Sequence, residues 1–468
     1  MRLLDENRLF PSDRQNRELA KALYSSVKDL PILSPHGHAD PAWFAHDAPF
    51  DDPATLFVTP DHYVFRMLYS QGVALEDLGI KPLDGAPAET DPREIWRRFA
   101  AHYYLFRGTP TRLWIDHSLQ EVFGVEDVLS SDTADSIYDH IAACLTQPEF
   151  RPRALFDRFG IEAIATTEGA LDRLEHHAAI AASDWSGRVI TTYRPDAVID
   201  PDHPNFRVNL GEFAEMTGCE TRTWEGYLQA HRVRRAAFRD QGATATDHGH
   251  PTAATANLNR AEAEALFECI VQGDHDAAQA DLFRAQMLTE MAKMSCEDGM
   301  VMQLHPGSHR NHSQRIFNRF GMDKGFDIPR RTDYVEALKP LLDVAGHDPN
   351  FTLIMFTLDE TTYARELAPL AGAYPALKLG PAWWFFDSPD GMRRFREMTT
   401  ETAGFYNTVG FNDDTRAFCS IPARHDVARR VDSAFLASLV AAGRLRETEA
   451  FDLAQDLTYG LAKKAYRL

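Results

Sequence analysis

The residues with the clearest capacity for chemistry are two histidines at the end of a short apolar run. His36 and His38 flank Gly37 shortly after Ile32 and Leu33. Residues i and i+2 of a strand point to the same side, so the two imidazoles can converge on one ion. Histidine is the commonest protein ligand of zinc and related metals, and Gly37 lets the backbone pass close to a bound group. An isolated His-x-His is nevertheless a weak motif, because most such pairs are surface or hydrogen-bonded histidines.

Strands must position those imidazoles, and short apolar runs recur along the chain between helical stretches. Amphipathic helices are expected, for example, at 261–271 and 334–342. Strands that alternate with helices form a parallel sheet. Eight such units predict an α/β protein with a closed (β/α)8 TIM-type barrel. The predicted strands are 31–35, 161–167, 188–193, 242–247, 299–305, 351–357, 376–380 and 408–412.

Almost every predicted strand ends in a side chain that can do chemistry. In a (β/α)8 barrel the functional groups collect at the C-terminal ends of the strands. Ordinary loops would favour small turn-forming residues at these positions instead. The strand ends include His36-Gly37-His38, Tyr193-Arg194, Asp247-His248-Gly249-His250, His305 to Arg310, Trp383-Trp384 and Asp413-Asp414-Thr415-Arg416.

The interval between the first two predicted strands is far longer than a helical return requires. It is rich in aromatic helix patterns, such as those at 63–69 and 95–106. We therefore predict an N-terminal segment with the first strand (1–41), an inserted helical subdomain (42–155), and the remainder of the barrel with C-terminal helices (156–468). Most aromatics of the insertion should form its own core. An insertion at this point also lies at the mouth of the barrel, where some of its residues can cap the site.

The composition limits the classes of partner. The 468 residues are 44% hydrophobic and 25% charged, with a formal net charge of -20. That charge argues against a nucleic-acid or anionic-membrane surface. It does not exclude an acidic substrate, because a few local arginines can outweigh a distant global charge.

The cysteines and the N-terminus indicate the compartment. The five cysteines are widely spaced without a Cys-x-x-Cys motif, which fits reduced thiols. The N-terminus lacks the apolar core of a signal peptide, and no apolar run approaches the ~20 residues of a membrane span. We predict a cytoplasmic protein.

The last predicted strand ends in Asp413-Asp414, and in a barrel this strand lies beside the first. Two histidines and one aspartate form a common open site for a catalytic divalent metal. Neighbours on a strand point oppositely, so one aspartate should face the site while the other is a helix N-cap or an ion-pair partner. Arg416 should share the side of Asp414, and it either neutralises that carboxylate or binds an anionic substrate.

Arg194 and Arg310 are further candidates for binding a carboxylate or a phosphate, because the planar guanidinium donates two parallel hydrogen bonds. Neither G-x-x-x-x-G-K-[ST] nor G-x-G-x-x-G occurs, which argues against nucleotide chemistry. His250, His309 and His312 are less well placed, and each by itself fits a structural or surface histidine.

Longer motifs give the chain a specific resemblance. It resembles the amidohydrolase superfamily and, within it, the uronate isomerases (glucuronate isomerase). The resemblance runs from about residue 5 to the C-terminus. The motifs are Ser34-Pro-His-Gly-His38, Asp61-His-Tyr-Val-Phe-Arg66, Arg153-Ala-Leu-Phe-Asp157, Tyr193-Arg-Pro-Asp196, Thr246-Asp-His248, Gln303-Leu-His-Pro-Gly307, Trp383-Trp384 and Asp414-Thr-Arg416.

The resemblance implies a role for each matching residue. His36 and His38 would bind a zinc-like divalent ion, and Asp414 would be both a metal-associated carboxylate and the general base. Many relatives have a neutral residue where Asp413 stands, which leaves open which of the two aspartates is the base. Arg416 and Tyr63 would stabilise the reacting oxygens. The substrate-binding residues would be His62, Arg194, Asp247, His305, Arg310 and either Trp383 or Trp384.

The implied reaction is the aldose–ketose isomerisation of hexuronates by proton transfer from C2 to C1 through an enediolate. It converts D-glucuronate to D-fructuronate and D-galacturonate to D-tagaturonate. A base must remove the C2 proton and a group must stabilise the enediolate, and both kinds of residue are present. The expected partners are a hexuronate and, in a homo-oligomer, further copies of the chain. Two alternatives remain: a metal-dependent hydrolase on the same scaffold, and a non-catalytic sugar-acid binding protein.

Overall fold

The barrel sheet contains seven parallel strands, and each coincides with a strand predicted from the sequence. The computed structural model describes residues 3–468 of the chain. Neighbouring strands follow the order β1-β2-β3-β4-β5-β8-β9, and every pair is parallel. This curled parallel sheet confirms the predicted α/β barrel class. The strands are β1 (Ile32–Ser34), β2 (Ile161–Gly169), β3 (Arg188–Arg194), β4 (Ala245–His248), β5 (Val301–Leu304), β8 (Leu353–Met355) and β9 (Leu377–Leu379).

An irregular segment takes the place of the eighth predicted strand, 408–412. Its ladder contact is a parallel bridge from Thr408 to β9. Gly410 then adopts a φ of +78°, which is incompatible with an extended strand. The segment still closes the ring, because the Thr415 carbonyl beyond it accepts a 3.0 Å hydrogen bond from the N–H of His38, just after β1.

Local sequence explains where the regular elements begin and end. Every residue of β5 and β8 is buried, as expected for strands that are covered on both faces. Helix α13 (Arg260–Gln272) begins at a capping box made by Asn259 and Glu262 and ends at Gly273 in the left-handed conformation. This helix and α16 (Val335–Ala345) confirm the two helices predicted at 261–271 and 334–342.

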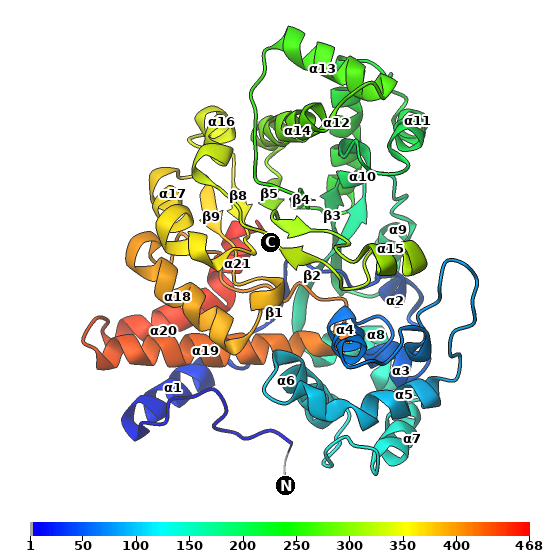
Figure 1. Cartoon of the computed structure of the whole chain (residues 1–468). Helices are drawn as coiled ribbons and strands as arrows, with labels where there is room; N and C mark the ends of the chain where they lie inside the picture. The colour runs from blue at the N-terminus through cyan, green and yellow to red at the C-terminus, as the bar shows by residue number, and fades with distance from the viewer. Residues whose placement is uncertain (1–2) are drawn as a thin grey trace.

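The other helices of the barrel pack around the outside of the sheet. Figure 1 shows α10–α14 at one end of the molecule, α16–α18 along one side, and α19 and α20 crossing the opposite end. Helix α1 packs along α19, so the N-terminal segment is fastened to the C-terminal helices. These helices are α1 (Arg14–Val27), α9 (Glu175–Ala181), α10 (Asp196–Ile199), α11 (Phe206–Thr217), α12 (Trp224–Asp240), α14 (Ala277–Asp298), α17 (Ala368–Ala373), α18 (Pro389–Ala403), α19 (Ile421–Ala441), α20 (Glu447–Gln455) and α21 (Leu461–Ala465).

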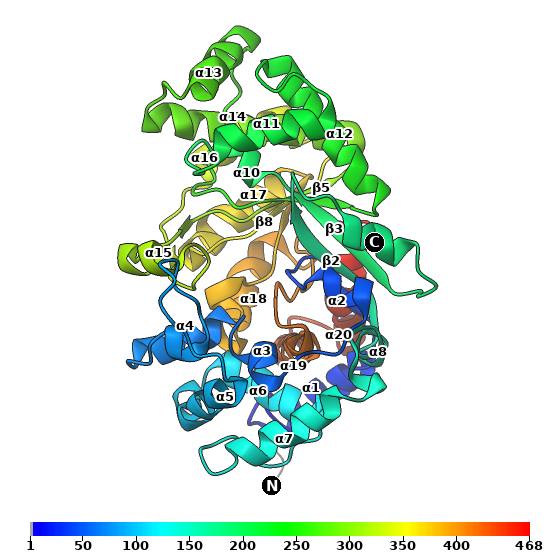
Figure 2. The ribbon, with the colours of Figure 1, turned by 90° about the vertical axis from the view of Figure 1, so that its right-hand side faces the viewer.

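The chain between β1 and β2 is helical and gathers on one side of the barrel. Figure 2 shows α3–α8 at the opposite end of the molecule from α11–α14. Aromatic residues of this region, such as Trp96, Phe99 and Phe106, are fully buried in a shared core, as the sequence predicts. The boundaries placed at 42 and 155 stay a prediction. The helices are α2 (Pro41–His46), α3 (Pro53–Phe57), α4 (His62–Ser70), α5 (Pro92–Ala101), α6 (Pro110–His117), α7 (Ala134–Leu145) and α8 (Pro152–Arg158).

A small antiparallel hairpin follows β5 and was not anticipated from the sequence. It pairs β6 (Ser308–His309) with β7 (Ile328–Pro329) around the short helix α15 (Gln314–Phe320). The segment 308–329 contacts the helical insertion, where the rings of Phe326 and Tyr69 lie 5.1 Å apart. It therefore connects the end of β5 to the insertion, on the same side as the predicted site.

Two predictions from composition can be compared with the described residues. In residues 3–468, no helix combines the length and the apolar composition that crossing a membrane requires. The five cysteines are free thiols, which agrees with the reading that they form no disulfide framework.

We expect Gly410→Ala to destabilise the protein by more than the conformational penalty of a left-handed residue, which is about 1–2 kcal/mol. The added Cβ would lie 2.7 Å from the carbonyl oxygen of Leu457. Gly218→Ala is the matched control, because Gly218 also has a positive φ, in the left-handed region, but an added Cβ would meet nothing within 4 Å. Urea denaturation of both variants measures the difference. Equal destabilisation by the two substitutions would contradict the role of the close approach.

Candidate active site

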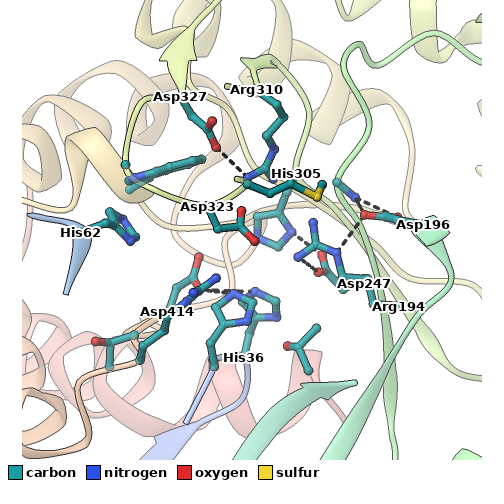
Figure 3. A pocket seen from close by; sticks show the side chains of 18 of the residues that line it. His36, His62, Arg194, Asp196, Asp247, His305, Arg310, Asp323, Asp327 and Asp414 are labelled. Carbon is teal, nitrogen blue, oxygen red and sulfur yellow. Dashed lines mark hydrogen bonds and ion pairs between the residues drawn. The ribbon is translucent and has the colours of Figure 1, made fainter. Parts of the chain in front are cut away.

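All twelve residues selected from the sequence line a single cavity of about 440 Å³. The cavity lies at the C-terminal ends of the barrel strands, where functional groups of this fold collect. Figure 3 shows His36, His62, Arg194, Asp247, His305, Arg310 and Asp414 directed toward its interior from different elements. The twelve residues are His36, His38, His62, Tyr63, Arg194, Asp247, His305, Arg310, Trp383, Trp384, Asp414 and Arg416.

The two histidines after β1 converge on one carboxylate oxygen. Oδ1 of Asp414 lies 3.2 Å from Nε2 of His38 and 3.5 Å from Nε2 of His36. Both histidines follow β1, whereas Asp414 follows the irregular segment that closes the barrel. The geometry thus brings together the two ends of the barrel that the sequence placed side by side.

The second oxygen of Asp414 is also bound. The indole Nε1–H of Trp383 donates a 2.6 Å hydrogen bond to Oδ2 of Asp414. Burial alone would raise the pKa of Asp414, but the nearby His36 and His38 lower it by more, so the pKa lies well below its ordinary value. Asp414 is therefore ionised, and Trp383, rather than Trp384, contacts it.

Asp413 points away from this cluster. Its Oδ2 lies 3.0 Å from Nε2 of His425 on α19, and its Oδ1 accepts a 3.1 Å hydrogen bond from Ser34 of β1. Asp413 is thus the neighbour that points away from the site, as strand alternation predicts, and it contacts a histidine whose pKa burial lowers. Only Asp414 of the two aspartates faces the histidines after β1.

A chain of polar contacts crosses the opposite wall of the cavity. Oδ1 of Asp247 lies 2.6 Å from Nδ1 of His305, and Oδ2 of Asp247 lies 3.3 Å from Nη1 of Arg194. Burial opposes ionisation of Asp247, but Arg194 and His305 hold its pKa well below the ordinary value. Burial lowers the pKa of His305 despite the adjacent carboxylate. A neutral His305 whose Nδ1–H donates to Asp247 leaves its Nε2 as a free acceptor.

The donor atoms suit a divalent cation. One nitrogen each from His36 and His38 and one oxygen from Asp414 lie within 4.8 Å of one another. Burial lowers the pKa of His38, which favours the neutral imidazole that metals require. Nε2 of His305 is buried without a hydrogen-bond partner, and the His305 ring stacks on His36 with 4.7 Å between centroids. A second set that shares His36, with Asp247 and His305, meets the same distance criterion.

The three predicted arginines differ in how their charge is balanced. Nη1 of Arg310 lies 3.0 Å from Oδ2 of Asp327, and its guanidinium stacks on Trp384. Arg194 is paired with two carboxylates, those of Asp196 and Asp247. Arg416 is exposed and, among residues 3–468, makes neither a hydrogen bond nor an ion pair. The alternative in which Arg416 neutralises Asp414 is therefore not favoured, and its charge remains available in the cavity.

The helical insertion supplies one wall through the first turn of α4. The His62 and Tyr63 rings stack with 4.6 Å between centroids, and His62 also meets the ring of Trp384. Burial, with the nearby Arg416 adding to it, lowers the pKa of His62 to about 3. Burial also raises the pKa of Tyr63. His62 is therefore neutral and Tyr63 protonated over the ordinary pH range.

Sequence reasoning missed a buried ion pair beneath this wall. Arg424 on α19 pairs with Asp387, and its guanidinium lies 3.6 Å from the ring centroid of Trp114 and 5.7 Å from that of Tyr63. Burial raises the pKa of Asp387 to about 7, although Arg424 opposes the shift. Arg424 lies within the largely buried helix α19 with no strand end beside it, so no sequence signal marked it.

Backbone strain concentrates at the cavity. Of the eight non-glycine residues with positive φ, four line it: Asn311, Asp323, Trp384 and Asp414. Asp414 has a φ of +37°. Such conformations cost of order 1–3 kcal/mol each and persist where surrounding contacts impose them. The contacts of Asp414 with His38 and Trp383 are of this kind.

Comparison with known proteins places these features in a family. The model of the family described as glucuronate isomerase matches residues 7–466. The uronate isomerase of Mesorhizobium japonicum is 68% identical over 466 residues, which cover 100% of this chain and 99% of that protein.

Solved structures agree with the sequence matches. The crystal structure of glucuronate isomerase from Caulobacter crescentus has a TM-score of 0.98 at 62% identity and covers 99% of this chain and 97% of that one. The uronate isomerase structure from Thermotoga maritima has a TM-score of 0.92 at 28% identity, with 99% of each chain covered.

We expect Trp383→Phe to lower kcat by about 10- to 100-fold, as for loss of a hydrogen bond to a charged group. The indole hydrogen bond holds the Asp414 carboxylate in its observed direction, and a phenyl ring cannot donate in its place. Trp384→Phe is the control, because in residues 3–468 the Trp384 indole makes ring contacts but no hydrogen bond. It should change KM and leave kcat within about threefold of wild type. An equal fall of kcat in both variants, measured by steady-state kinetics, would contradict the assignment.

Proposed function

The chain belongs to the glucuronate isomerase family, and on that premise we propose how its cavity carries out uronate isomerisation. The substrates are D-glucuronate, converted to D-fructuronate, and D-galacturonate, converted to D-tagaturonate. A proton moves from C2 to C1 through an enediolate. The observation that carries this proposal is the ionised Asp414 carboxylate, which faces the cavity among His36, His38 and Trp383.

Asp414 is the proposed base. The aldehyde at C1 acidifies the C2 proton, and removal of that proton moves the electron pair into a C1–C2 double bond with negative charge on O1. Return of the proton to C1 and transfer of the O2 hydroxyl proton to O1 give the ketose. One carboxylate can serve both proton transfers at carbon, because C1 and C2 are adjacent. The lowered pKa keeps Asp414 ionised but makes it a weaker base, so the acidity of the C2 proton must come from the C1 carbonyl and the donors that stabilise the enediolate.

Arg416 and Tyr63 are proposed to stabilise the charge that develops on O1 and O2. Arg416 carries a charge that no carboxylate of the described chain neutralises through an ion pair. Tyr63 stays protonated, so its hydroxyl can donate to a developing oxyanion. The Tyr63 ring is held by its contacts with His62 and Trp114, so its hydroxyl needs little reorganisation when the charge forms.

The remaining predicted residues would bind the open-chain sugar. The C6 carboxylate requires positive charge, which Arg194 and Arg310 supply, while the neutral His62 contributes a hydrogen bond without charge. His62 and Arg194 enter the cavity from opposite sides in Figure 3. His305, Asp247, Trp383 and Trp384 complete the walls.

His36, His38 and Asp414 would hold a divalent ion, which we propose to be Zn²⁺. When bound, such an ion supplies Lewis acidity toward sugar oxygens and keeps the substrate in one orientation. Assembly of several copies into a homo-oligomer also remains a prediction.

Turnover itself is the first test. Purified, metal-loaded protein should convert D-glucuronate into a ketose of identical mass, with loss of the C2 proton signal and appearance of two C1 protons in NMR spectra. D-Galacturonate should behave in the same way. Hydrolysis of glucuronolactone to glucuronate without formation of any ketose would instead indicate a hydrolase, and tight binding of glucuronate without any product would indicate a sugar-acid binding protein.

Asp414→Asn should lower kcat by about 10²- to 10⁴-fold, the range for loss of a general base, while glucuronate still binds. Calorimetry measures the binding and metal analysis measures the ion content. Asp413→Asn is the matched control, because Asp413 pairs with His425 outside the cavity. It should lower the melting temperature and leave kcat within about tenfold of wild type. Near-normal turnover of Asp414→Asn would remove Asp414 as the base.

The KM for glucuronate should show no inflection near the ordinary histidine pKa of about 6.5. The pKa of His62 is lowered to about 3, so His62 is neutral throughout the range from about pH 5 to pH 8 and gains no charge that could attract the substrate. Steady-state kinetics at several pH values give the profile. A KM that falls as the pH drops through about 6.5, and that loses this dependence in His62→Gln, would show that His62 binds as a cation.

A further inference from the structure

The Arg194 guanidinium is held in place from two directions. Its Nε donates a 2.8 Å hydrogen bond to Oδ2 of Asp196, and its Nη1 lies 3.3 Å from Oδ2 of Asp247. Figure 3 shows these contacts on one wall of the cavity. Burial would lower the pKa of Arg194, but Asp196 and Asp247 raise it by more, so the group stays charged. An arginine with two carboxylate partners cannot turn freely, and its remaining N–H groups point in one direction.

The Asp196 carboxylate is itself fixed by the backbone after β4. The N–H of Gly249 lies 3.1 Å and 3.3 Å from the two carboxylate oxygens of Asp196. On the other side, the second oxygen of Asp247 is held by His305. Each carboxylate that holds Arg194 is thus fixed by a further contact.

Gly249 is a glycine because of the arginine. A Cβ at this position would lie 2.1 Å from Nη2 of Arg194 and 2.9 Å from Oδ2 of Asp196. The φ of Gly249 lies outside the left-handed region, so the backbone conformation does not require glycine. The atoms that an added methyl group would meet are ends of side chains, which can move without disturbing the fold. The absent Cβ therefore leaves room for the guanidinium in its observed position.

The same loop offers a competing interpretation as a second metal site. Donor atoms of Asp196, His248 and His250 lie within 4.8 Å of one another, and Nδ1 of His248 is buried without a partner. However, the carboxylate in this set already accepts hydrogen bonds from Arg194 and Gly249. A divalent cation on that carboxylate would lie beside a guanidinium of the same sign. These contacts indicate that Asp196 holds the Arg194 guanidinium rather than a metal cation.

We propose that Asp196 and Gly249 are positioning residues, which hold the Arg194 guanidinium in the direction from which it binds the uronate. This inference rests on the proposed function, in which Arg194 contacts the substrate. A donor fixed before binding loses little freedom when the substrate arrives, so binding of the anionic sugar is stronger than with a mobile side chain. The glycine contributes by leaving space, and the aspartate by a directed, charge-assisted hydrogen bond.

The test is Gly249→Ala in two backgrounds. In the wild-type background the methyl group must displace the guanidinium, so KM for D-glucuronate and the calorimetric Kd should rise about 10- to 100-fold, as for loss of a hydrogen bond to a charged group. The kcat should change by less than about threefold, because the proton-transfer residues are untouched. The melting temperature should stay within a few degrees of wild type.

In the Arg194→Ala background the same substitution should have no further effect on KM or Kd. No guanidinium is then present for the methyl group to displace, so the two changes are non-additive. An equal fold-change in both backgrounds would overturn the proposal, because the alanine would then act on the site without involving Arg194. An unchanged KM and Kd for Gly249→Ala in the wild-type background would overturn it as well.

A second variant and a control complete the design. Asp196→Asn removes the charge but keeps the shape, and should raise KM about 3- to 10-fold only while Arg194 is present. Gly372→Ala on α17 is the control, because Gly372 lies outside the cavity lining, its φ is not in the left-handed region, and an added Cβ would meet nothing within 4 Å. It should leave KM and Kd within about twofold of wild type.

Failure of the proposed function gives a different result. Arg194→Ala with unchanged KM and Kd would show that Arg194 does not contact the substrate. It would overturn both the proposed substrate contact of Arg194 and the proposed positioning role of Asp196 and Gly249. Absence of turnover in the wild type would refute the isomerase while the Kd measurements still decide whether Gly249 acts through Arg194.

Discussion

The rest of the site depends on the contacts of the Asp414 carboxylate with His36, His38 and Trp383. The carboxylate joins the end of the barrel to its beginning, because one oxygen faces His36 and His38 after β1 and the other accepts the Trp383 indole hydrogen bond. Its backbone is held at a φ of +37°, a conformation that aspartate tolerates only at a cost. Asp413 fixes the same turn on the side away from the cavity, through its hydrogen-bond contacts with His425 and Ser34. The strain and the surrounding contacts together direct a single ionised oxygen pair into the cavity.

Charge balance around this carboxylate explains how an acidic chain can bind an acidic sugar. Four carboxylates near the cavity pair with arginines, Asp196 and Asp247 with Arg194, Asp327 with Arg310, and Asp387 with Arg424, whereas Asp61 and Asp323 line the cavity without an ion pair in residues 3–468. In each pair the carboxylate orients the guanidinium and offsets its positive charge. Arg416 makes no ion pair within residues 3–468, and it is the exposed cation of the cavity. The formal charge of -20 is a property of the whole chain, whereas binding responds to the field within the cavity.

The helical insertion and the hairpin after β5 enclose the open end of the barrel. Tyr63 and His62 enter from α4, and burial keeps the first protonated and the second neutral. Gly325 of the hairpin region lies against His62, where an added Cβ would meet the His62 Cβ at 3.0 Å. Segments that are far apart in sequence thus supply opposite walls of one cavity.

The sequence by itself indicated the barrel class and the strand-end residues that the structure brings into one cavity, because both leave local patterns. Buried parallel strands are continuous apolar runs, and the barrel places functional groups directly after them, so His36, His305 and the Asp413-Asp414 pair stood out by type and position. Local patterns carry no information about partners chosen across the fold. Only the tertiary structure decided that Asp414 rather than Asp413 faces the histidines, that Trp383 rather than Trp384 contacts it, and that 408–412 leaves the strand at Gly410. The roles of Arg424 and Gly249 could not be predicted from the sequence for the same reason. Arg424 lies within a helix and pairs with Asp387, and Gly249 matters only because it leaves room for the Arg194 guanidinium.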